Sequence, residues 1–347
     1  MYKYKTIEAA SDGPLGLAGE TIVGAKRSEV SAEEWDEFAK LCDASFRCSY
    51  AGTRLWQFEH DPLCRIERLD IYLALSLTPI KIGQCAVGIG RRSSVFTDTI
   101  QILPAFNSYF QQSMQAVLRH LGPGQYKYGS EWTIAPCRVH EVASIAGVKD
   151  VHARHVDVFA IDFTRWNDFE TYFQAVSTNA KRNINKARKT YEKLTVQEQR
   201  KLNVFLNILP LQRLRHRLFV KKGVKSSIFT LFLRSAFRTL ATSRYSSSAR
   251  LADGHATLAR FLQITFGRNS FYMEAAADSG HPYASAFLLR EMIKRAFEQS
   301  GGLGRFVMGP DDHGQAGTPS WDGLVRSRLQ WNASAHPTSV FEFTYAS

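Results

Sequence analysis

The chain has 347 residues, of which 44% are hydrophobic and 12% aromatic, enough for two buried cores, and this excludes a largely disordered protein. No stretch approaches the roughly 20 apolar residues of a membrane-spanning helix, so we expect no integral membrane segment. The net charge of +12 favours acidic partners such as nucleic acid, coenzyme phosphates, acidic carrier proteins or anionic membrane surfaces, without choosing among them.

The cysteines and the start of the chain indicate a reducing compartment. None of the cysteines forms a CxxC pair or stands at metal-ligand spacing with histidine, so we expect reduced thiols and no metal site. The start, MYKYKTIEAASDGPLG, has no apolar core after its basic residues, unlike a secretory signal. We therefore expect a cytoplasmic protein. The cysteines are Cys42, Cys48, Cys64, Cys85 and Cys137.

The first half reads as a helix, a strand meander, a second helix and a strand. Ser31 and Glu34 form a capping-box pattern at the start of SAEEWDEFAKLCDASF, which predicts a helix. IYLALSL, IGQCAVGIG and SVFTDTIQIL are predicted strands. A helix is predicted over 106–121, where Gly122 ends it, and YKYGSEWTIA is a further strand.

The second half repeats this order of elements without repeating the sequence. VDVFAIDF predicts a strand, and one or two helices follow in DFETYFQAVSTNAKRNINKARKTYEKL, with another in SSIFTLFLRSAFRTLATS. HATLARFLQITF and SFYMEAAAD flank the turn GRN as a hairpin. PYASAFLLREMIKRAFEQ is an amphipathic helix that Gly301 ends, and RFVMG and SVFEFTY are short strands.

Strands and helices that are mixed, without strict alternation, indicate an α/β (α+β) fold with a mixed, partly antiparallel sheet and helices packed on it. The polar stretch GVKDVHARH precedes a new strand and marks a boundary near 151–156. We therefore predict two similar domains in tandem, an N-terminal one over 1–152 and a C-terminal one over 153–347.

Two stretches of the second half carry a family resemblance. FETYFQAVSTNAKRNINKARKTYEKL and HPYASAFLLREMIKRAFEQSGGLGRFVMGPDD resemble the tandem branch of GNAT-fold acyltransferases, which includes Fem-type aminoacyl transferases and the acetyltransferase-like proteins of cellulose-biosynthesis operons. The resemblance is strongest over about 156–335. It implies two tandem GNAT-like domains, with the donor and catalytic site in the second.

The departures from that pattern matter for the donor. GNAT enzymes that bind acetyl-CoA carry Arg/Gln-x-x-Gly-x-Gly/Ala at the start of the long helix, whose backbone amides hold pyrophosphate. SGHPYASAFLL lacks these glycines, as does the Fem-like branch. That branch often follows its last glycine with a Tyr-Lys pair and a tryptophan. GPDDHGQAGTPSWDG lacks the pair and keeps Trp321, our candidate acceptor contact.

Most of the positive charge lies in one segment. Between Lys181 and Lys225 there are fourteen Lys or Arg against two acids. In STNAKRNINKARK, an apolar stripe of Ala180, Ile184, Ala187 and Tyr191 leaves the cations on the rest of the helix. An all-positive face predicts phosphate or nucleic-acid contact, and a merely solvated helix face is the alternative. The candidate donor residues here are Lys181, Arg182, Asn183, Lys186 and Lys189.

A second basic run, RLRHRLFVKKGVK, carries the same two interpretations, non-specific phosphate contact or a solvated helix end. No aromatic residues suited to base stacking interleave these cations, so an RNA-reading sheet is not indicated. Tyr283 and Ser285, at the start of the long helix, are further candidates for the donor site, with core or capping roles as the alternative.

Amide formation from an ester or thioester requires a base for the attacking amine and donors for the carbonyl oxygen. Alternation in SFYMEAAAD places Tyr272, Glu274 and Ala276 on one face, and Glu274 resembles the general base of many GNAT enzymes. The alternative is an exposed carboxylate paired with Arg260 or Arg268.

A second acid/base set follows RFVMG, where open α/β sheets place ligands. Its residues are Asp311, Asp312 and His313, and ordinary turn chemistry is the alternative. The chain contains no P-loop, GxSxG, HExxH or CxxC array, which disfavours the corresponding NTPases, hydrolases and zinc enzymes.

The sequence therefore predicts a transferase that forms an amide on a small-molecule or peptide amine, with an acidic activated donor. The basic field and the missing glycine loop slightly favour aminoacyl-tRNA. Acyl-CoA, as a cosubstrate, and acyl carrier protein remain alternatives, and no tightly bound cofactor is expected. A non-catalytic binding protein with this fold is a second alternative, and peripheral membrane association through the basic segment is a third.

Overall fold

The computed structural model describes residues 22–74, 79–281, 283–312 and 319–346. The predicted capping box opens the first helix: the Glu34 amide donates to Ser31 Oγ over 3.2 Å, and the Ser31 amide donates to Glu34 Oε2 over 3.0 Å. The elements of the first half are β1 (Ile22–Arg27), α1 (Ala32–Leu41), α2 (Tyr50–His60), β2 (Arg65–Ala74), β3 (Ile80–Ile89), β4 (Ser94–Phe96), β5 (Gln101–Ile102), α3 (Phe110–Leu121), β6 (Gly124–Gly129) and α4 (Val139–Ala143).

The second half contains the predicted hairpin and long helix. β10 and β11 pair antiparallel around the GRN turn, and α9 ends before Gly301, whose φ of 62° is the left-handed conformation that glycine adopts readily. Its elements are β7 (Val148–Asp162), α5 (Phe169–Ala175), α6 (Thr178–Thr190), β8 (Leu194–Arg200), α7 (Phe205–Lys221), α8 (Ile228–Ala241), β9 (Ser246–Asp253), β10 (Ala256–Phe266), β11 (Asn269–Ala277), α9 (Ala284–Ser300), β12 (Arg305–Asp312), α10 (Pro319–Gln330) and β13 (Ser334–Tyr345).

Both halves contribute to one continuous sheet of 13 strands in the described residues. The order is β1-β2-β3-β4-β6-β13-β7-β12-β11-β10-β9-β8, and β5 pairs with β3. Most neighbours are antiparallel, while β4–β6 and β11–β12 are parallel. The predicted mixed, partly antiparallel sheet is therefore confirmed.

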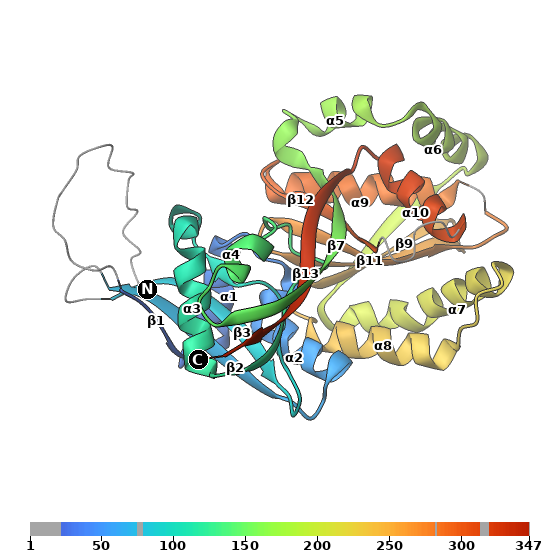
Figure 1. Ribbon diagram of the computed structural model, residues 1–347. Helices are drawn as coiled ribbons and strands as arrows, with labels where there is room; N and C mark the ends of the chain where they lie inside the picture. Colours follow the sequence, from blue (N-terminus) through green and yellow to red (C-terminus); the bar gives the residue numbers. More distant parts are fainter. Residues whose placement is uncertain (1–21, 75–78, 282, 313–318, 347) are drawn as a thin grey trace.

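Two long strands join the halves. β13, the last strand, lies between β6 and β7 and pairs with β7 from Ser334↔Ala160 to Tyr345↔Val148, crossing the middle of the molecule (Figure 1). The predicted boundary between 152 and 153 falls inside β7. The polar sequence there forms a strand because β13 satisfies one edge of its backbone while most of its side chains face solvent.

A shared core also connects the halves. Phe46 and Leu55 of the first half pack with Val158, Phe271 and Val307 of the second in one buried cluster. Phe46 and Phe271 contact each other edge to face, with ring centroids 5.1 Å apart. Each fully buried phenylalanine of this kind contributes about 1.5–3 kcal/mol through the hydrophobic effect.

The helices of the second half lie on opposite faces of the sheet. Phe261 of β10 packs in a core with residues of α6 and α9, whereas its neighbour Leu262 packs with Leu211 of α7. Figure 1 shows α5, α6 and α9 on one side, with α7 and α8 side by side on the other. Among the described residues, no helix combines the length and apolar composition that crossing a bilayer requires.

One predicted strand face is wrong. Along β11 the register with β10 shifts between Leu262 and Gln263, so Glu274 pairs with Leu262 and Tyr272 pairs with Gln263. This bulge inserts Met273, which turns Tyr272 to the face opposite Glu274. Tyr272 consequently packs against the core under α9, while Glu274 faces α7 and α8.

Candidate functional site

The parallel strands β11 and β12 diverge after a short paired segment. Ser270 pairs with Phe306 and Phe271 with Val307, and the described residues show no further pair between these two strands. α9 connects them and begins at Ala284, close to the end of β11 at Ala277. Because open α/β sheets bind ligands at the carboxyl ends of their strands, the end of β11 is a natural place for a site.

A cavity of about 570 Å³ lies at this end of β11. It is enclosed by β11, the turn at 278–281, the first turn of α9 and one side of α7. Tyr283 and Ser285, predicted near the donor, both line this cavity. We call it the C-terminal cavity.

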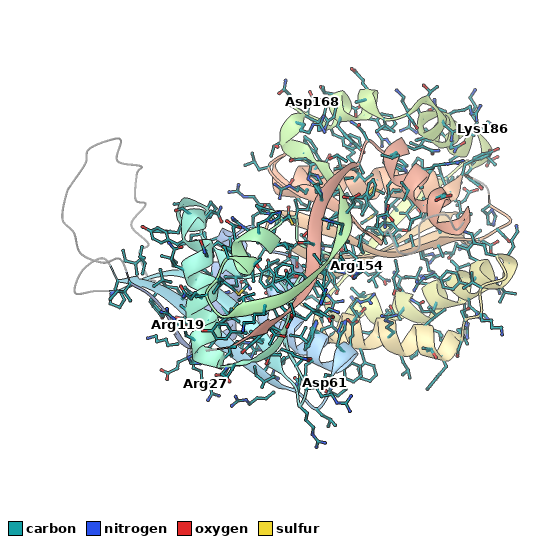
Figure 2. All side chains as sticks on the ribbon, viewed as in Figure 1. Arg27, Asp61, Arg119, Arg154, Asp168 and Lys186 are labelled. Atoms are coloured by element: carbon teal, nitrogen blue, oxygen red, sulfur yellow. The ribbon has the colours of Figure 1, made fainter. Side chains whose placement is uncertain are left out.

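Cations from two distant parts of the sequence meet at the C-terminal cavity. Arg217, Lys221 and Lys222, at the end of α7, line it directly. From α6, on the other side of the sheet, Lys186 places its Nζ 5.1 Å from the centre of the Tyr283 ring, a cation–π contact. Lys186 lies on α6 near the outer edge of the molecule in Figure 2. The α7 run therefore lines the cavity, and one residue of the α6 run, Lys186, contacts a residue of its wall.

The remaining α6 candidates are spread along the helix. Asn183 lines an adjoining cavity of about 230 Å³, which Ser285 also lines. Lys181 Nζ donates to the Gln174 carbonyl over 3.0 Å, and Arg182 donates to Asn179 over 2.9 Å. Lys189 is exposed and lines neither cavity.

The predicted apolar stripe of α6 is confirmed. Ala180, Ile184, Ala187 and Tyr191 are all buried, in the same core as α9. Ser177 caps the helix by accepting a hydrogen bond from the Ala180 amide over 3.2 Å. Packing of this stripe fixes the orientation of α6 and leaves its cations on the outer surface.

Glu274 lies in a buried polar cluster and not in the C-terminal cavity. One carboxylate oxygen accepts hydrogen bonds from Gln212 and from Ser235, the latter over 3.1 Å. The other oxygen lies 3.0 Å from Arg215 Nη1 and 3.2 Å from Arg238 Nη1. Two arginines and two neutral donors thus occupy both oxygens, which suits a structural carboxylate better than a free base.

The alternative partners proposed for Glu274, Arg260 and Arg268, are not the ones it has. Helices α7 and α8 supply the two arginines and two neutral donors, because the bulge at Met273 directs Glu274 toward that face. The general-base assignment of Glu274 stays a prediction that this geometry does not favour.

The second predicted acid/base set lies at the end of β12. Asp311 is buried there, and Arg328 of α10 donates to the adjacent Pro310 carbonyl over 2.9 Å. Burial lowers the pKa of Arg328, and the nearby Asp311 carboxylate opposes that shift. Asp311 does not line the C-terminal cavity.

The side chains of three candidate residues lie outside the described part of the structure. His313 lies outside the described residues. Asp312 ends β12 and Trp321 belongs to α10, but their side chains also fall outside the described part. Their predicted roles in acid/base chemistry and acceptor binding stay predictions.

Several residues of the C-terminal cavity were missed from the sequence. Asp278, His281 and Tyr272 line it, and Asp278 lies 3.9 Å from Arg217 across it. The sequence feature that could have identified them is the turn DSGH, directly after a strand. In the structure the Gly280 amide donates to Asp278 Oδ1 over 2.9 Å. Burial raises the pKa of Tyr272 to about 12, so its hydroxyl is a hydrogen-bond donor at neutral pH.

A larger cavity, of about 950 Å³, is lined mostly by the first half, with Arg154 and Val340 from the second, and the sequence predicted none of its residues. It adjoins the parallel pair β4–β6, which joins only Ser94 to Tyr126 and Val95 to Lys127 in the described residues. Each half thus has a cavity beside its own parallel strand pair. We call this one the N-terminal cavity.

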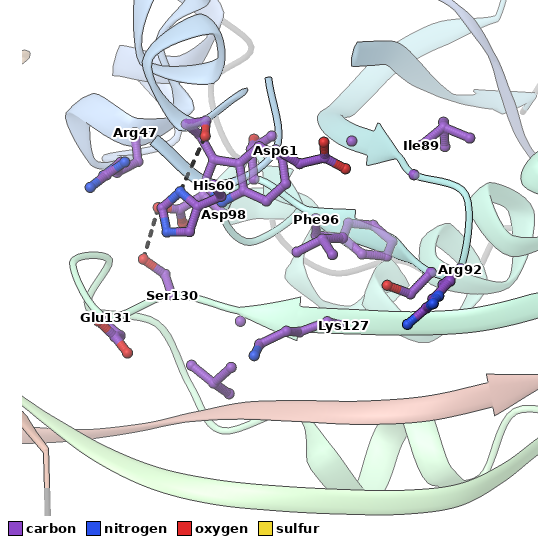
Figure 3. A pocket seen from close by; sticks show the side chains of 18 of the residues that line it. Arg47, His60, Asp61, Ile89, Arg92, Phe96, Asp98, Lys127, Ser130 and Glu131 are labelled. Atoms are coloured by element: carbon purple, nitrogen blue, oxygen red, sulfur yellow. Dashed lines mark hydrogen bonds between the residues drawn. The ribbon is translucent and has the colours of Figure 1, made fainter. Parts of the chain in front are cut away.

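The N-terminal cavity combines a buried carboxylate with cations (Figure 3). Asp98 lies in its wall and accepts hydrogen bonds from the hydroxyls of Ser45, Ser130 and Thr133 over 2.6–3.0 Å. Cations and acids both line it, and some pair with each other, as Arg154 does with Glu131 over 2.6 Å. Such a lining suits a polar ligand that carries both signs of charge. The lining cations include Arg47, Arg92, Lys127 and Arg154.

The described residues contain no group of three or more His, Cys, Asp or Glu side chains able to hold a metal ion. The five cysteines, all within the described part, are free thiols.

A scan against protein-family models found no match, and a search of curated proteins found none either. Among solved structures, the chain is similar to FemX, with a TM-score of 0.67 at 9% identity over 93% of this chain and 97% of that one. It is also similar to a conserved protein of unknown function from Bacteroides thetaiotaomicron VPI-5482, with a TM-score of 0.58 at 11% identity over 92% and 99% of the two chains. These similarities show the fold, and the predicted Fem-like fold is confirmed.

Proposed function

We propose that the protein is an N-acyltransferase that takes an acyl group from a phosphate-bearing donor and forms an amide on an amine acceptor. The observation that carries this proposal is the C-terminal cavity. Three cations at the end of α7 line it beside the N-terminus of α9, and Lys186 of α6, more than 30 residues from Lys221 in the sequence, contacts Tyr283 in its wall. A helix N-terminus and converging cations together favour a bound anion.

The extent of the basic surface helps to choose among the candidate donors. Lys186, Lys221 and Lys222 suffice to hold the phosphates of a small donor at the cavity. The cations Arg182, Arg188 and Lys189 are exposed along α6, outside the C-terminal cavity. A polyanion larger than the cavity gives these side chains a role, so we favour aminoacyl-tRNA as the donor over acyl-CoA or acyl carrier protein.

The chemistry requires few groups. The amine nitrogen attacks the acyl carbon, the bond from that carbon to the donor oxygen or sulfur breaks, and the amine loses a proton. His281 lines the cavity with a ring able to accept this proton. The Tyr272 hydroxyl is a donor for the carbonyl oxygen as negative charge develops.

The N-terminal cavity shares no lining residue with the C-terminal cavity, so we propose it as a separate site for a polar molecule and not as the place of the attacking amine. At about 950 Å³ it accommodates a small molecule or the end of a peptide. The Asp61 carboxylate in its wall complements an amine, and the lining arginines complement carboxylate or phosphate groups of the same molecule.

The test compares donor binding by the wild type and a Lys186→Ala/Lys221→Ala/Lys222→Ala variant, with fluorescent tRNA and fluorescent coenzyme A as separate probes. A matched control removes three exposed cations of the first half that line neither cavity, Arg27, Arg119 and Lys149. We expect the first variant to lose tRNA affinity and the control to keep it. The slope of log affinity against log salt should change by about 0.7–0.9 for each phosphate that the variant no longer neutralises.

The outcomes separate the donors. Binding of coenzyme A alone, abolished in the same variant, would replace tRNA by acyl-CoA as the donor. Equal losses of affinity in the variant and the control would show non-specific charge attraction and contradict the donor site.

A non-catalytic binding protein is the second candidate function, favoured by the four partners that already occupy Glu274. Single-turnover transfer from aminoacyl-tRNA to a panel of amines decides between the two. Tight donor binding without transfer to any amine would favour the binder.

A further inference from the structure

Helices α7 and α8 form an antiparallel hairpin whose outer surface is unusual for a soluble protein. The fully buried residues of α8 are polar, Ser235 and Thr239. Its large apolar side chains are only partly buried or exposed, and Phe229, Phe237 and Leu240 are exposed. Usually the apolar face of a surface helix is the buried one. Phe237 packs against Phe58 of α2, with ring centroids 4.4 Å apart, while Phe229 and Leu240 stay 66% and 56% exposed.

The turn of this hairpin concentrates both apolar and basic side chains. Val220 is 61% exposed, Val224 45% and Phe229 66%. Lys221, Lys222 and Lys225 are exposed between them. We call residues 220–229 the hairpin tip, and it lies at the outer edge of the molecule in Figure 1.

The tip has a defined shape. The Lys222 and Val224 amides donate to the Leu218 and Phe219 carbonyls, over 3.1 and 2.9 Å, and close the end of α7. Gly223 has a φ of 70°, the left-handed conformation that this closure needs. His216 Nδ1 lies 3.0 Å from Ser226 Oγ, which ties the turn back to α7. The exposed side chains are thus presented by an ordered turn.

The charge around the tip has one sign. Residues 199–252 contain twelve Lys or Arg and no Asp or Glu. Lysines with interspersed apolar residues are typical of segments that lie in the interface of an anionic membrane, where apolar side chains enter the acyl boundary and lysines contact headgroups.

We propose that the hairpin tip docks the protein on an anionic lipid surface, with Val224 and Phe229 inserted and Lys225 at the headgroups, beside Lys221 and Lys222 at the rim of the C-terminal cavity. This goes beyond the proposed transferase function and does not depend on it. Membrane binding of this kind needs no spanning helix, because a short amphipathic segment suffices.

Other binding partners fit the hairpin tip less well than a lipid surface does. A second copy of the chain would bring two sets of tip lysines together with no acid in 199–252 to offset them. Nucleic acid would engage the lysines but leave the exposed valines without a partner. A protein partner needs about 1,200–2,000 Å² of buried surface in total, which is large for a ten-residue tip.

The experiment is co-sedimentation of the full chain with vesicles of phosphatidylcholine alone and with an equal mixture of phosphatidylcholine and phosphatidylglycerol. We expect binding to the mixture that falls when salt rises from about 0.1 M to about 1 M, since the Debye length shortens from about 10 Å to about 3 Å. A Val224→Ser/Phe229→Ser variant should bind at least about tenfold more weakly, because it loses apolar insertion.

The matched control is Leu303→Ser, at a side chain that is 58% exposed just after the C-terminal end of α9, away from the tip. Val224 and Phe229 do not line the C-terminal cavity, so the double variant should keep donor binding when vesicles are absent. Failure of the donor site and failure of membrane docking are thereby distinguishable.

The proposal is overturned if the wild type does not sediment with the mixed vesicles, or if the double variant sediments as the wild type does. It is also overturned if the double variant loses RNA binding while its vesicle binding is unchanged, which would make the tip a nucleic-acid contact.

Discussion

Arg238 of α8 bridges two carboxylates from different halves of the chain, Glu274 of β11 at 3.2 Å and Glu59 of α2 at 3.4 Å. Arg47, at 2.8 Å from Glu59, and Arg215, at 3.0 Å from Glu274, extend the chain of ion pairs in both directions. Arg47 lines the N-terminal cavity, so the network runs from that cavity to the helices that support the second half.

Replacing Arg238 should destabilise the protein strongly. Arg238→Ala leaves two buried carboxylates each short of one partner, and breaking a buried pair of this kind costs about 3–5 kcal/mol. Urea denaturation followed by circular dichroism measures the change in the free energy of unfolding. The matched control is Arg244→Ala, whose ion pair with Glu33 is exposed and should contribute less than about 1 kcal/mol. Equal effects in the two variants would contradict the structural role of Arg238.

The same network predicts acid sensitivity. Burial alone would raise the pKa of Glu59, but Arg47 and Arg238 outweigh it and hold the pKa below the ordinary value of 4.5. A carboxyl whose pKa is lowered by folding stabilises the native state above its unfolded pKa, and this stability is lost as pH falls through the folded value. The unfolding free energy should therefore fall as pH drops below about 4.5, and more steeply in the wild type than in Glu59→Gln. Identical pH dependence in both proteins would exclude Glu59 as a source of this stability.

Glu274→Gln tests the predicted general base against the structural role that the geometry favours. The amide keeps the shape but removes the charge that Arg215 and Arg238 face, so we expect lower stability while transfer by the folded protein stays within about tenfold of wild type. Loss of a general base would instead lower the rate by about 10²–10⁴ with little change in stability. Single-turnover rates and denaturation midpoints of one preparation separate the two cases.

The contrast around Glu274 shows where sequence analysis succeeded and failed. The hairpin of β10 and β11, the amphipathic α9 and the apolar stripe of α6 follow from local periodicity and turn residues, and all three were predictable. The bulge at Met273 has no such signal, because it depends on how β11 pairs with β10. Once it is present, Tyr272 and Glu274 face opposite sides, and the partners of Glu274 come from helices 36–62 residues away in sequence.

The continuous sheet formed by both halves could not be predicted from the sequence, for a similar reason. The polar residues at the start of β7 indicated a domain boundary because polarity reports solvent exposure and not backbone pairing. β13 pairs with them from almost two hundred residues further along the chain. The convergence of Lys186 and Lys221 likewise depends on tertiary packing, although each basic run was visible in the sequence.

The cysteines should differ sharply in reactivity. Burial raises the pKa of Cys42 to about 12 and that of Cys85 and Cys48 as well, so their thiols stay protonated and shielded, whereas Cys137 is exposed. Brief treatment of the native protein with iodoacetamide at pH 8 should label Cys137 first, and labelling of Cys48 and Cys85 should require denaturant. Peptide mass spectrometry measures the order. Rapid native labelling of Cys85 would contradict the buried position assigned to it.

His281 is the residue on which the proposed chemistry depends most directly. It lines the C-terminal cavity and its ring centroid lies 5.9 Å from that of Tyr191, which helps to hold its orientation. If its imidazole accepts the proton of the attacking amine, His281→Asn should lower the single-turnover transfer rate by about 10²-fold or more, with donor affinity nearly unchanged.

The control for this prediction is His255→Asn, at an exposed histidine of the β9–β10 turn that lines neither cavity. A purely structural role would change the denaturation midpoint or the donor affinity together with the rate, whereas loss of a base lowers the transfer rate alone. A variant that keeps the wild-type rate would remove His281 from the mechanism and direct the search for the base to Asp278, in the same cavity wall.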